Sequence, residues 1–208
     1  MKIYKAEVGM LATNCYLAVN EENGQAVVFD PGADVETILE MANETQAEIV
    51  AILLTHGHND HIGAVAELKR VTGAKVYISE GDADCLTRAD KNLSLFMGDS
   101  VQSATADYIL HDGELLSLAG MEFKVLATPG HTGGGVCFYN ESAEVVFVGD
   151  TIFCESIGRT DLPGGSYREL LTSIKNKILT LPDATGLLPG HGPATTVDWE
   201  KRRNPFLQ

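Results

Sequence analysis

Short apolar or alternating segments recur along the chain, separated by turn residues, which is the pattern of β-strands. The dipeptides Asn23-Gly24 and Asp112-Gly113 favour tight turns between such segments, and Ala119-Gly120 lies between two alternating runs. The pattern predicts strands over residues 3–8, 15–19, 26–30, 49–54, 75–79, 114–118, 121–127, 135–139, 145–149 and 186–188.

Helical periodicity appears between these strand blocks. The predicted helices cover residues 34–44, 62–71, 166–179 and 197–203. Asp34 is predicted to cap the first helix, Gly73 to end the second, and the last is predicted to stop before Pro205. Strand blocks that alternate with helices in both halves indicate a mixed α/β protein.

Composition supports one domain over residues 1–208, because 44% of the residues are hydrophobic and can fill a sizeable core. There is no low-complexity linker and no internal repeat. We found neither an apolar run of membrane-spanning length nor the pattern of a signal peptide, so we expect a cytoplasmic protein. The four cysteines form no C-x-x-C pair and are predicted to be free thiols: Cys15, Cys85, Cys137 and Cys154.

The formal net charge of −14 disfavours nucleic acid and anionic membranes as partners, because both require a basic surface. Bound divalent cations would add positive charge locally. An anionic small molecule therefore stays compatible with this chain if metal ions are present at its site. The sequence pattern does not fix the oligomeric state.

Four metal-capable side chains lie within six residues, in the stretch LLTHGHNDHIG: His56, His58, Asp60 and His61. Imidazole and carboxylate are common ligands of zinc and related metals. The chain has only 6 histidines, and this stretch holds three of them. A metal site is therefore a much better interpretation than a polar loop of chance composition.

Three further candidate ligands occur in a repeated context, in which an apolar segment ends at a Gly or Pro turn. His131 follows FKVLATPG, Asp150 follows VVFVG, and His191 follows LLPG. His56 likewise follows the apolar run IVAILL. Functional groups of layered α/β proteins gather beyond the carboxyl ends of strands. These residues are therefore predicted to meet at one rim.

The spacing H-x-H-x-D-H, followed by separate His, Asp and His residues, resembles the metallo-β-lactamase superfamily. The resemblance extends from FDPGAD at 29–34 to PGHG at 189–192. The motifs TPGHTGGG, VGDTIF and IGRTDLPGG resemble those of glyoxalase II, in particular its short hydroxyacylglutathione hydrolases. The resemblance implies a four-layer αββα sandwich.

The same resemblance implies two metal ions, each held by three residues, and a shared carboxylate. The first set is His56, His58 and His131, the second is Asp60, His61 and His191, and the bridging residue is Asp150. Zinc is the first expectation, with iron or manganese as alternatives, because the same ligands accept all three.

Such a site supports hydrolysis without a side-chain nucleophile. A hydroxide bridging two metals forms near neutral pH and can attack a thioester or ester carbonyl. Asp150 would set the metal spacing, and Asp60 would tether the second metal and orient the hydroxide, so both are candidate catalytic residues. The predicted substrate is a small thioester, with 2-hydroxyacyl glutathione the first to try. Only 17 residues follow His191, so we expect this chain to lack the glutathione-binding helical extension of full-length glyoxalase II and to recognise glutathione weakly.

Two alternative functions differ in class. A mononuclear iron persulfide dioxygenase would use His56, His131 and Asp150, and such enzymes also carry a GRTD-like loop. A di-iron oxygen-reducing module is disfavoured, because those modules resemble this chain less: they place a carboxylate where His58 stands and carry a fused flavin-binding domain.

Several other residues have two interpretations. Arg159 could clamp a substrate carboxylate or pair with Asp161 or Glu155 to fix its loop. The irregular segment 80–108 could cover the site with apolar residues or pack against the sheet edge. His111 is predicted to lie on the surface. Three threonines are candidate hydrogen-bond partners of the imidazoles, or ordinary turn residues: Thr55, Thr128 and Thr132.

Overall fold

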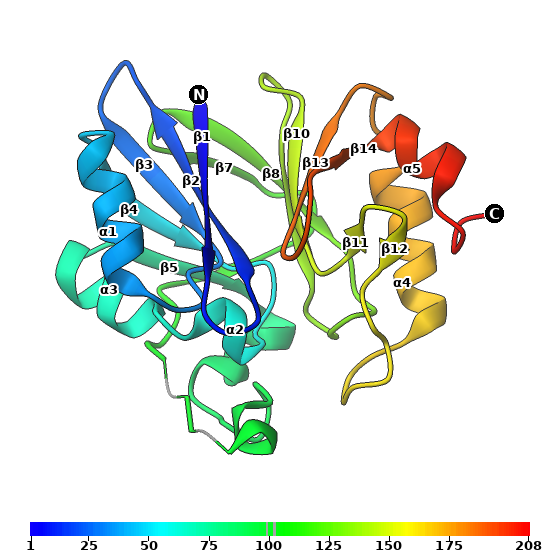
Figure 1. The fold of residues 1–208 in the computed structure, drawn as a ribbon, viewed down its shortest axis with the longest axis horizontal. Helices are drawn as coiled ribbons and strands as arrows, with labels where there is room; N and C mark the ends of the chain where they lie inside the picture. Colours follow the sequence, from blue (N-terminus) through cyan, green and yellow to red (C-terminus); the bar gives the residue numbers. More distant parts are fainter. Residues whose placement is uncertain (99, 102) are drawn as a thin grey trace.

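The computed structural model describes residues 1–98, 100–101 and 103–208, and its centre is a pair of six-stranded sheets (Figure 1). The first sheet contains, in spatial order, β1 (Lys2–Val8), β2 (Thr13–Asn20), β3 (Gln25–Phe29), β4 (Glu48–Leu53), β5 (Lys75–Ser79) and β6 (Tyr108–Leu110). The second contains β14 (Thr195–Thr196), β13 (Gly186–Pro189), β10 (Val145–Gly149), β9 (Val136–Asn140), β8 (Met121–Ala127) and β7 (Leu115–Leu118). A small hairpin, β11 (Ile152–Phe153) and β12 (Ser156–Ile157), follows β10.

Helices cover the outer faces of both sheets (Figure 1). The helices α1 (Val35–Glu44) and α3 (Val65–Thr72) lie on the first sheet. On the second lie α4 (Tyr167–Ser173), its π-helical continuation η3 (Ile174–Ile178), and α5 (Val197–Arg203). The predicted four-layer αββα sandwich is confirmed. Among the described residues, no helix has the length and apolar character needed to cross a membrane.

Three apolar clusters fill the three interfaces between the four layers. Stacked and edge-to-face aromatic rings join the two sheets: Phe29, Phe123, Phe138 and Phe147. Ile38 of α1 and Leu68 of α3 pack on the first sheet, and Leu170 and Ile174 pack on the second. Central strands are thus buried on both faces, which explains why they are continuous apolar runs in the sequence.

The strand directions bring the predicted ligands to one end of the sandwich. In the first sheet, β3, β4, β5 and β6 run parallel. In the second, β10 is parallel to β13, and β8 points the same way because both β8 and β10 are antiparallel to β9. The segments that follow β8, β10 and β13 therefore leave the second sheet at the same edge.

The predicted elements differ from the structure mainly at short segments and caps. The predicted helix 62–71 is two pieces, α2 (Asn59–Ile62) and α3, although Gly73 does end the second with a positive φ of 73°. Asp34 occupies the predicted N-cap position of α1, but its side chain makes no capping hydrogen bond; the carboxylate accepts from the Gly9 amide at 2.8 Å instead. The strands β6, β11, β12 and β14 are too short to produce a recognisable periodicity.

Candidate metal centre

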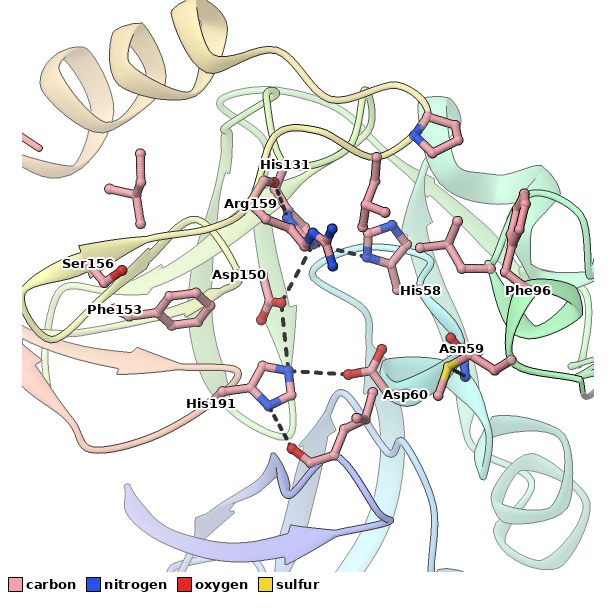
Figure 2. A pocket seen from close by; sticks show the side chains of 16 residues that line it. His58, Asn59, Asp60, Phe96, His131, Asp150, Phe153, Ser156, Arg159 and His191 are labelled. Atoms are coloured by element: carbon pink, nitrogen blue, oxygen red, sulfur yellow. Dashed lines mark hydrogen bonds and ion pairs between the residues drawn. The ribbon is translucent and has the colours of Figure 1, made fainter.

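Five histidines and two aspartates converge at the carboxyl ends of the strands. Figure 2 shows five of these seven residues: His58, Asp60, His131, Asp150 and His191. The loop after β4 provides His56 and His58, and the adjoining α2 provides Asp60 and His61. The loops after β8, β10 and β13 provide the other three: His131, Asp150 and His191. The structure thus brings together all seven residues that the sequence suggested as ligands.

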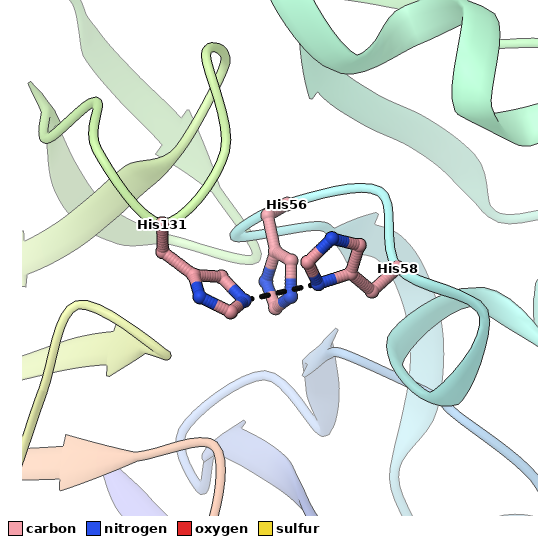
Figure 3. A group of neighbouring side chains, drawn as sticks. All are labelled: His56, His58 and His131. Atoms are coloured by element: carbon pink, nitrogen blue, oxygen red, sulfur yellow. Dashed lines mark hydrogen bonds between the residues drawn. The ribbon is translucent and has the colours of Figure 1, made fainter. Parts of the chain in front are cut away.

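Three of the histidines form one group (Figure 3). The nitrogen atoms of His56, His58 and His131 lie within 4.8 Å of one another, and His131 Nε2 is 2.9 Å from His58 Nδ1. Burial lowers the pKa of the His58 imidazole to about 3 and holds that of His56 well below its ordinary value. Burial therefore favours the neutral form of the His56 and His58 imidazoles, which is the form that donates a lone pair to a metal.

Asp60, His61 and His191 form the second group, again with ligand atoms within 4.8 Å of one another. His191 Nε2 lies 3.2 Å from Asp60 Oδ2, and His61 Nε2 lies 3.5 Å from the same oxygen. The Thr13 hydroxyl donates a hydrogen bond to that oxygen at 3.1 Å. This second group is less enclosed than the first, because Asp60 and His191 are only partly buried.

The Asp150 carboxylate lies between the two groups (Figure 2). Its Oδ1 is 3.4 Å from His61 Nε2, and its Oδ2 is 3.6 Å from the Nε2 atoms of both His131 and His191. The turn before His191 allows this approach because Gly190 has no side chain. A Cβ at that position would lie 2.3 Å from Asp150 Oδ1 and 2.6 Å from the His61 ring.

In four of the five rings, those other than His58, a partner holds the outer Nδ1, so that Nε2 faces the centre. His131 Nδ1 donates to the Arg159 carbonyl at 2.8 Å, and His191 Nδ1 donates to the Leu11 carbonyl at 3.1 Å. Carbonyl oxygens only accept, so these rings carry their proton on Nδ1. Their Nε2 atoms are therefore free to bind a cation at the centre.

Asp30 orients two further histidines and was not identified as a site residue from the sequence. Its Oδ2 accepts from His61 Nδ1 at 3.0 Å and from the Thr55 hydroxyl at 2.6 Å, and its Oδ1 accepts from the Thr55 amide. Because the Thr55 hydroxyl proton is directed at Asp30, its oxygen accepts from His56 Nδ1 at 3.1 Å. One buried carboxylate therefore holds a histidine of each group.

A second buried carboxylate, Asp82, joins the two loops that carry the three-histidine group. It accepts hydrogen bonds from the Gly57 amide, the Thr132 hydroxyl and the Gly134 amide at 3.0, 2.7 and 2.9 Å. Nothing in the irregular sequence around Asp82 indicates this role. Asp30, in contrast, follows an apolar strand and precedes Pro31-Gly32, which is the context that revealed the other site residues.

The remaining predicted residues have clear positions. Thr55 contacts a site histidine, whereas Thr128 hydrogen-bonds Thr151 and Cys137, and Thr132 hydrogen-bonds Asp82. His111 lies on the surface, as predicted. The four cysteines are free.

Arg159 lies at the edge of the pocket above the site, and its guanidinium forms a two-point ion pair with Asp161 at 2.8 and 2.9 Å. The Arg159 side chain is 61% exposed. The loop-bracing contact considered from the sequence is thus present, with Asp161 as the partner.

The residues present fit a cation, because several buried polar atoms at the centre lack a hydrogen-bond partner among the described residues: His56 Nε2, His61 Nε2 and Asp150 Oδ1. Unpaired buried polar atoms are costly unless a ligand satisfies them. Burial lowers the pKa of His61, but the surrounding carboxylates outweigh it and hold that pKa well above its ordinary value. The centre therefore calls for positive charge, which divalent ions would supply.

Comparison with known proteins agrees with this geometry. The profile of the Metallo-beta-lactamase superfamily matches residues 8–191. The probable metallo-hydrolase YqgX of Bacillus subtilis (strain 168) is 40% identical over 209 residues, which cover 100% of this chain and 98% of that protein. The hydroxyacylglutathione hydrolase GloC of Haemophilus influenzae (strain ATCC 51907 / DSM 11121 / KW20 / Rd) is 36% identical over 209 residues, with the same coverage.

Solved structures show the same fold. The BLEG-1 B3 metallo-beta-lactamase superposes with a TM-score of 0.96 and 39% identity, covering 100% of both chains. TTHA1623 in a di-iron-bound form superposes with a TM-score of 0.88 and 38% identity, covering 98% of this chain and 100% of that one. ETHE1 from Myxococcus xanthus superposes with a TM-score of 0.84 and 30% identity, covering 99% of this chain and 84% of that one. With the family profile spanning most of its length and close relatives aligned over all of it, this chain belongs to the metallo-beta-lactamase superfamily.

Proposed function

We propose that this protein is a metal-dependent hydrolase of small thioesters, similar to hydroxyacylglutathione hydrolases. The observation that supports it best is the placement of Asp150 between two three-residue groups. In this proposal, one divalent ion is held by His56, His58 and His131, the other by Asp60, His61 and His191, and both by Asp150. Zinc is our first candidate. Iron is the second, because the similar TTHA1623 has a di-iron-bound form.

Two divalent ions at this centre would make a water nucleophilic near neutral pH and polarise the substrate carbonyl. The protein's own groups prepare the geometry. Asp30 and the carbonyls of Arg159 and Leu11 hold the imidazoles in fixed tautomers. Asp60 faces the pocket and can accept a hydrogen bond from the attacking water. A leaving thiolate needs little protonation, because thiol pKa values lie near 8.5.

The hydrolase proposal predicts two metal ions per chain and release of thiol from thioesters. The test reconstitutes the protein separately with zinc and iron, measures metal content at saturation, and follows thiol release from 2-hydroxyacyl glutathione. Removing the metal with a chelator should abolish turnover, and adding it back should restore activity. A firm plateau at one ion per chain would reject the two-metal centre.

A mononuclear iron persulfide dioxygenase is the alternative, and the likeness to ETHE1 at 30% identity is the reason to test it. His131 Nε2 and Asp150 Oδ2 lie 3.6 Å apart, so two of its three proposed ligands are neighbours. The same reconstituted samples are assayed for oxygen consumption with glutathione persulfide. Oxygen uptake by the iron form, with no thioester cleavage by either form, would replace the hydrolase proposal.

Arg159 provides a further prediction, because its guanidinium lines the pocket and is mostly exposed. If it binds a substrate carboxylate by two hydrogen bonds, Arg159→Lys removes that geometry. The KM for acidic thioesters should then rise about tenfold, and the KM for neutral thioesters should rise less. Asp161→Asn serves as the control, since it breaks the ion pair and leaves the guanidinium in place. Equal losses for both substrate types would assign Arg159 to loop bracing alone.

A further inference from the structure

The pocket above the candidate metal centre has a volume of about 770 Å³, and one of its walls is strongly apolar. This wall comes from the segment around η2 (Ser94–Met97) and consists of Leu93, Phe96 and Met97. The Phe96 side chain is 75% exposed and that of Met97 50%. Large apolar side chains held in water at the edge of a reactive site favour contact with an apolar ligand.

A second apolar wall lies across the centre from the first. It consists of Phe153 and Ile157, from the β11–β12 hairpin. The Phe153 ring lies edge-on to His191, with 6.2 Å between centroids. Figure 2 shows Phe153 and Phe96 on opposite sides of Asp150 and His58.

The pocket has few charged groups that could recognise an anionic thiol, such as glutathione, as the thiol part of a thioester substrate. Among the described residues that line it, Arg159 is the only lysine or arginine, and Asp161 already pairs with it. The other polar lining residues outside the candidate metal centre are neutral: Asn59 and Ser156. A thiol with several carboxylates would meet a single lysine or arginine among the described lining residues, Arg159, which is already paired with Asp161. The chain as a whole has a net charge of −14.

We propose that the preferred substrates are neutral thioesters with an apolar acyl group, bound between these two walls. The inference rests on the proposed hydrolase function and narrows its substrate class. The two substituents of a thioester carbonyl diverge from the reacting carbon, so each meets one wall when the carbonyl is at the metal centre. We place the acyl chain against the wall of Leu93, Phe96 and Met97, because Phe96 is the most exposed large apolar side chain of the pocket. Its burial there supplies the binding energy that charged contacts do not.

A chain-length series tests the proposal on the metal-loaded protein. The substrates are acetyl, butyryl, hexanoyl and octanoyl thioesters of the neutral thiol N-acetylcysteamine. Each buried methylene should raise kcat/KM about fourfold, which corresponds to about 0.8 kcal/mol. Phe96→Ala should flatten this rise. Leu95→Ala is the matched control, because Leu95 belongs to the same η2 turn, is 60% exposed and does not line the pocket.

A second measurement separates this inference from the proposed reaction. The Kd of the corresponding thioethers, in which a methylene replaces the carbonyl, is determined by calorimetry for wild type and both variants. Chain-length dependence that is lost in Phe96→Ala and retained in Leu95→Ala supports the apolar site even if no thioester is cleaved. Hydrolysis with a flat chain-length profile, or faster cleavage of a glutathione thioester than of its neutral counterpart, would overturn the inference and leave the hydrolase proposal standing.

Discussion

Asp150→Ala is expected to abolish detectable thioester hydrolysis and to weaken the binding of both metal ions. The Asp150 carboxylate contacts His131 of the first group and His61 and His191 of the second, so it reaches both groups directly. Losing a partner outside the ligand shell already costs about 10- to 100-fold in metal affinity or activity. Removing a shared ligand should cost more than about 100-fold.

The measurement is metal content by equilibrium dialysis beside kcat/KM, with circular dichroism to show that the variant is folded. His58→Ala gives the contrast, because it should weaken only the first position. Asp183→Ala is the control for loss of an aspartate, since Asp183 is exposed and pairs with Lys201 on the surface. If Asp150→Ala kept two ions per chain with wild-type affinity, Asp150 would not be the bridging ligand.

Asp30→Asn should impair both halves of the centre although Asp30 is not a proposed ligand. Asp30 accepts three hydrogen bonds, two from Thr55 and one from His61. In the Asp30→Asn variant, an NH2 group would replace one carboxylate oxygen and point a donor at the donors of Thr55 or His61. The remaining hydrogen bonds would lose their charged acceptor. We expect metal affinity to fall by about 10- to 100-fold. The free energy of unfolding of the metal-free protein should fall by about 3 kcal/mol, the cost of breaking a buried ionic pair.

Asp34→Asn is the matched control for this substitution. Asp34 belongs to the same loop and has the same left-handed backbone, with φ of 51° against 49° for Asp30, but its exposed carboxylate binds the Gly9 amide. Metal titration and urea unfolding compare the two variants. A change in stability without a change in metal affinity would reduce Asp30 to a packing role, and equal effects in both variants would assign the loss to the loop backbone.

Much of the fold was predictable because its central strands are continuous apolar runs. The predicted strands 75–79, 121–127 and 145–149 coincide with β5, β8 and β10. Helix ends were less predictable where the cap depends on a distant partner. Asp34 occupies the N-cap of α1 as expected, yet its carboxylate accepts from Gly9 on another segment, so local propensity gave the right position and the wrong hydrogen-bond partner.

By itself, the sequence determined the candidate ligands, because local chemistry encodes them: the spacing of His56, His58, Asp60 and His61, and turns that follow apolar strands. The tertiary structure places these residues in the two groups that the family resemblance implied, and it alone showed which ring nitrogen faces inward. It alone revealed that Asp82 joins the two loops of the three-histidine group by hydrogen bonds, and that Phe96 belongs to an apolar wall facing Phe153. The physical reason is that a carboxylate or an aromatic ring acts through whatever lies within a few ångströms of it, and here those neighbours come from distant segments that meet only when the two sheets pack.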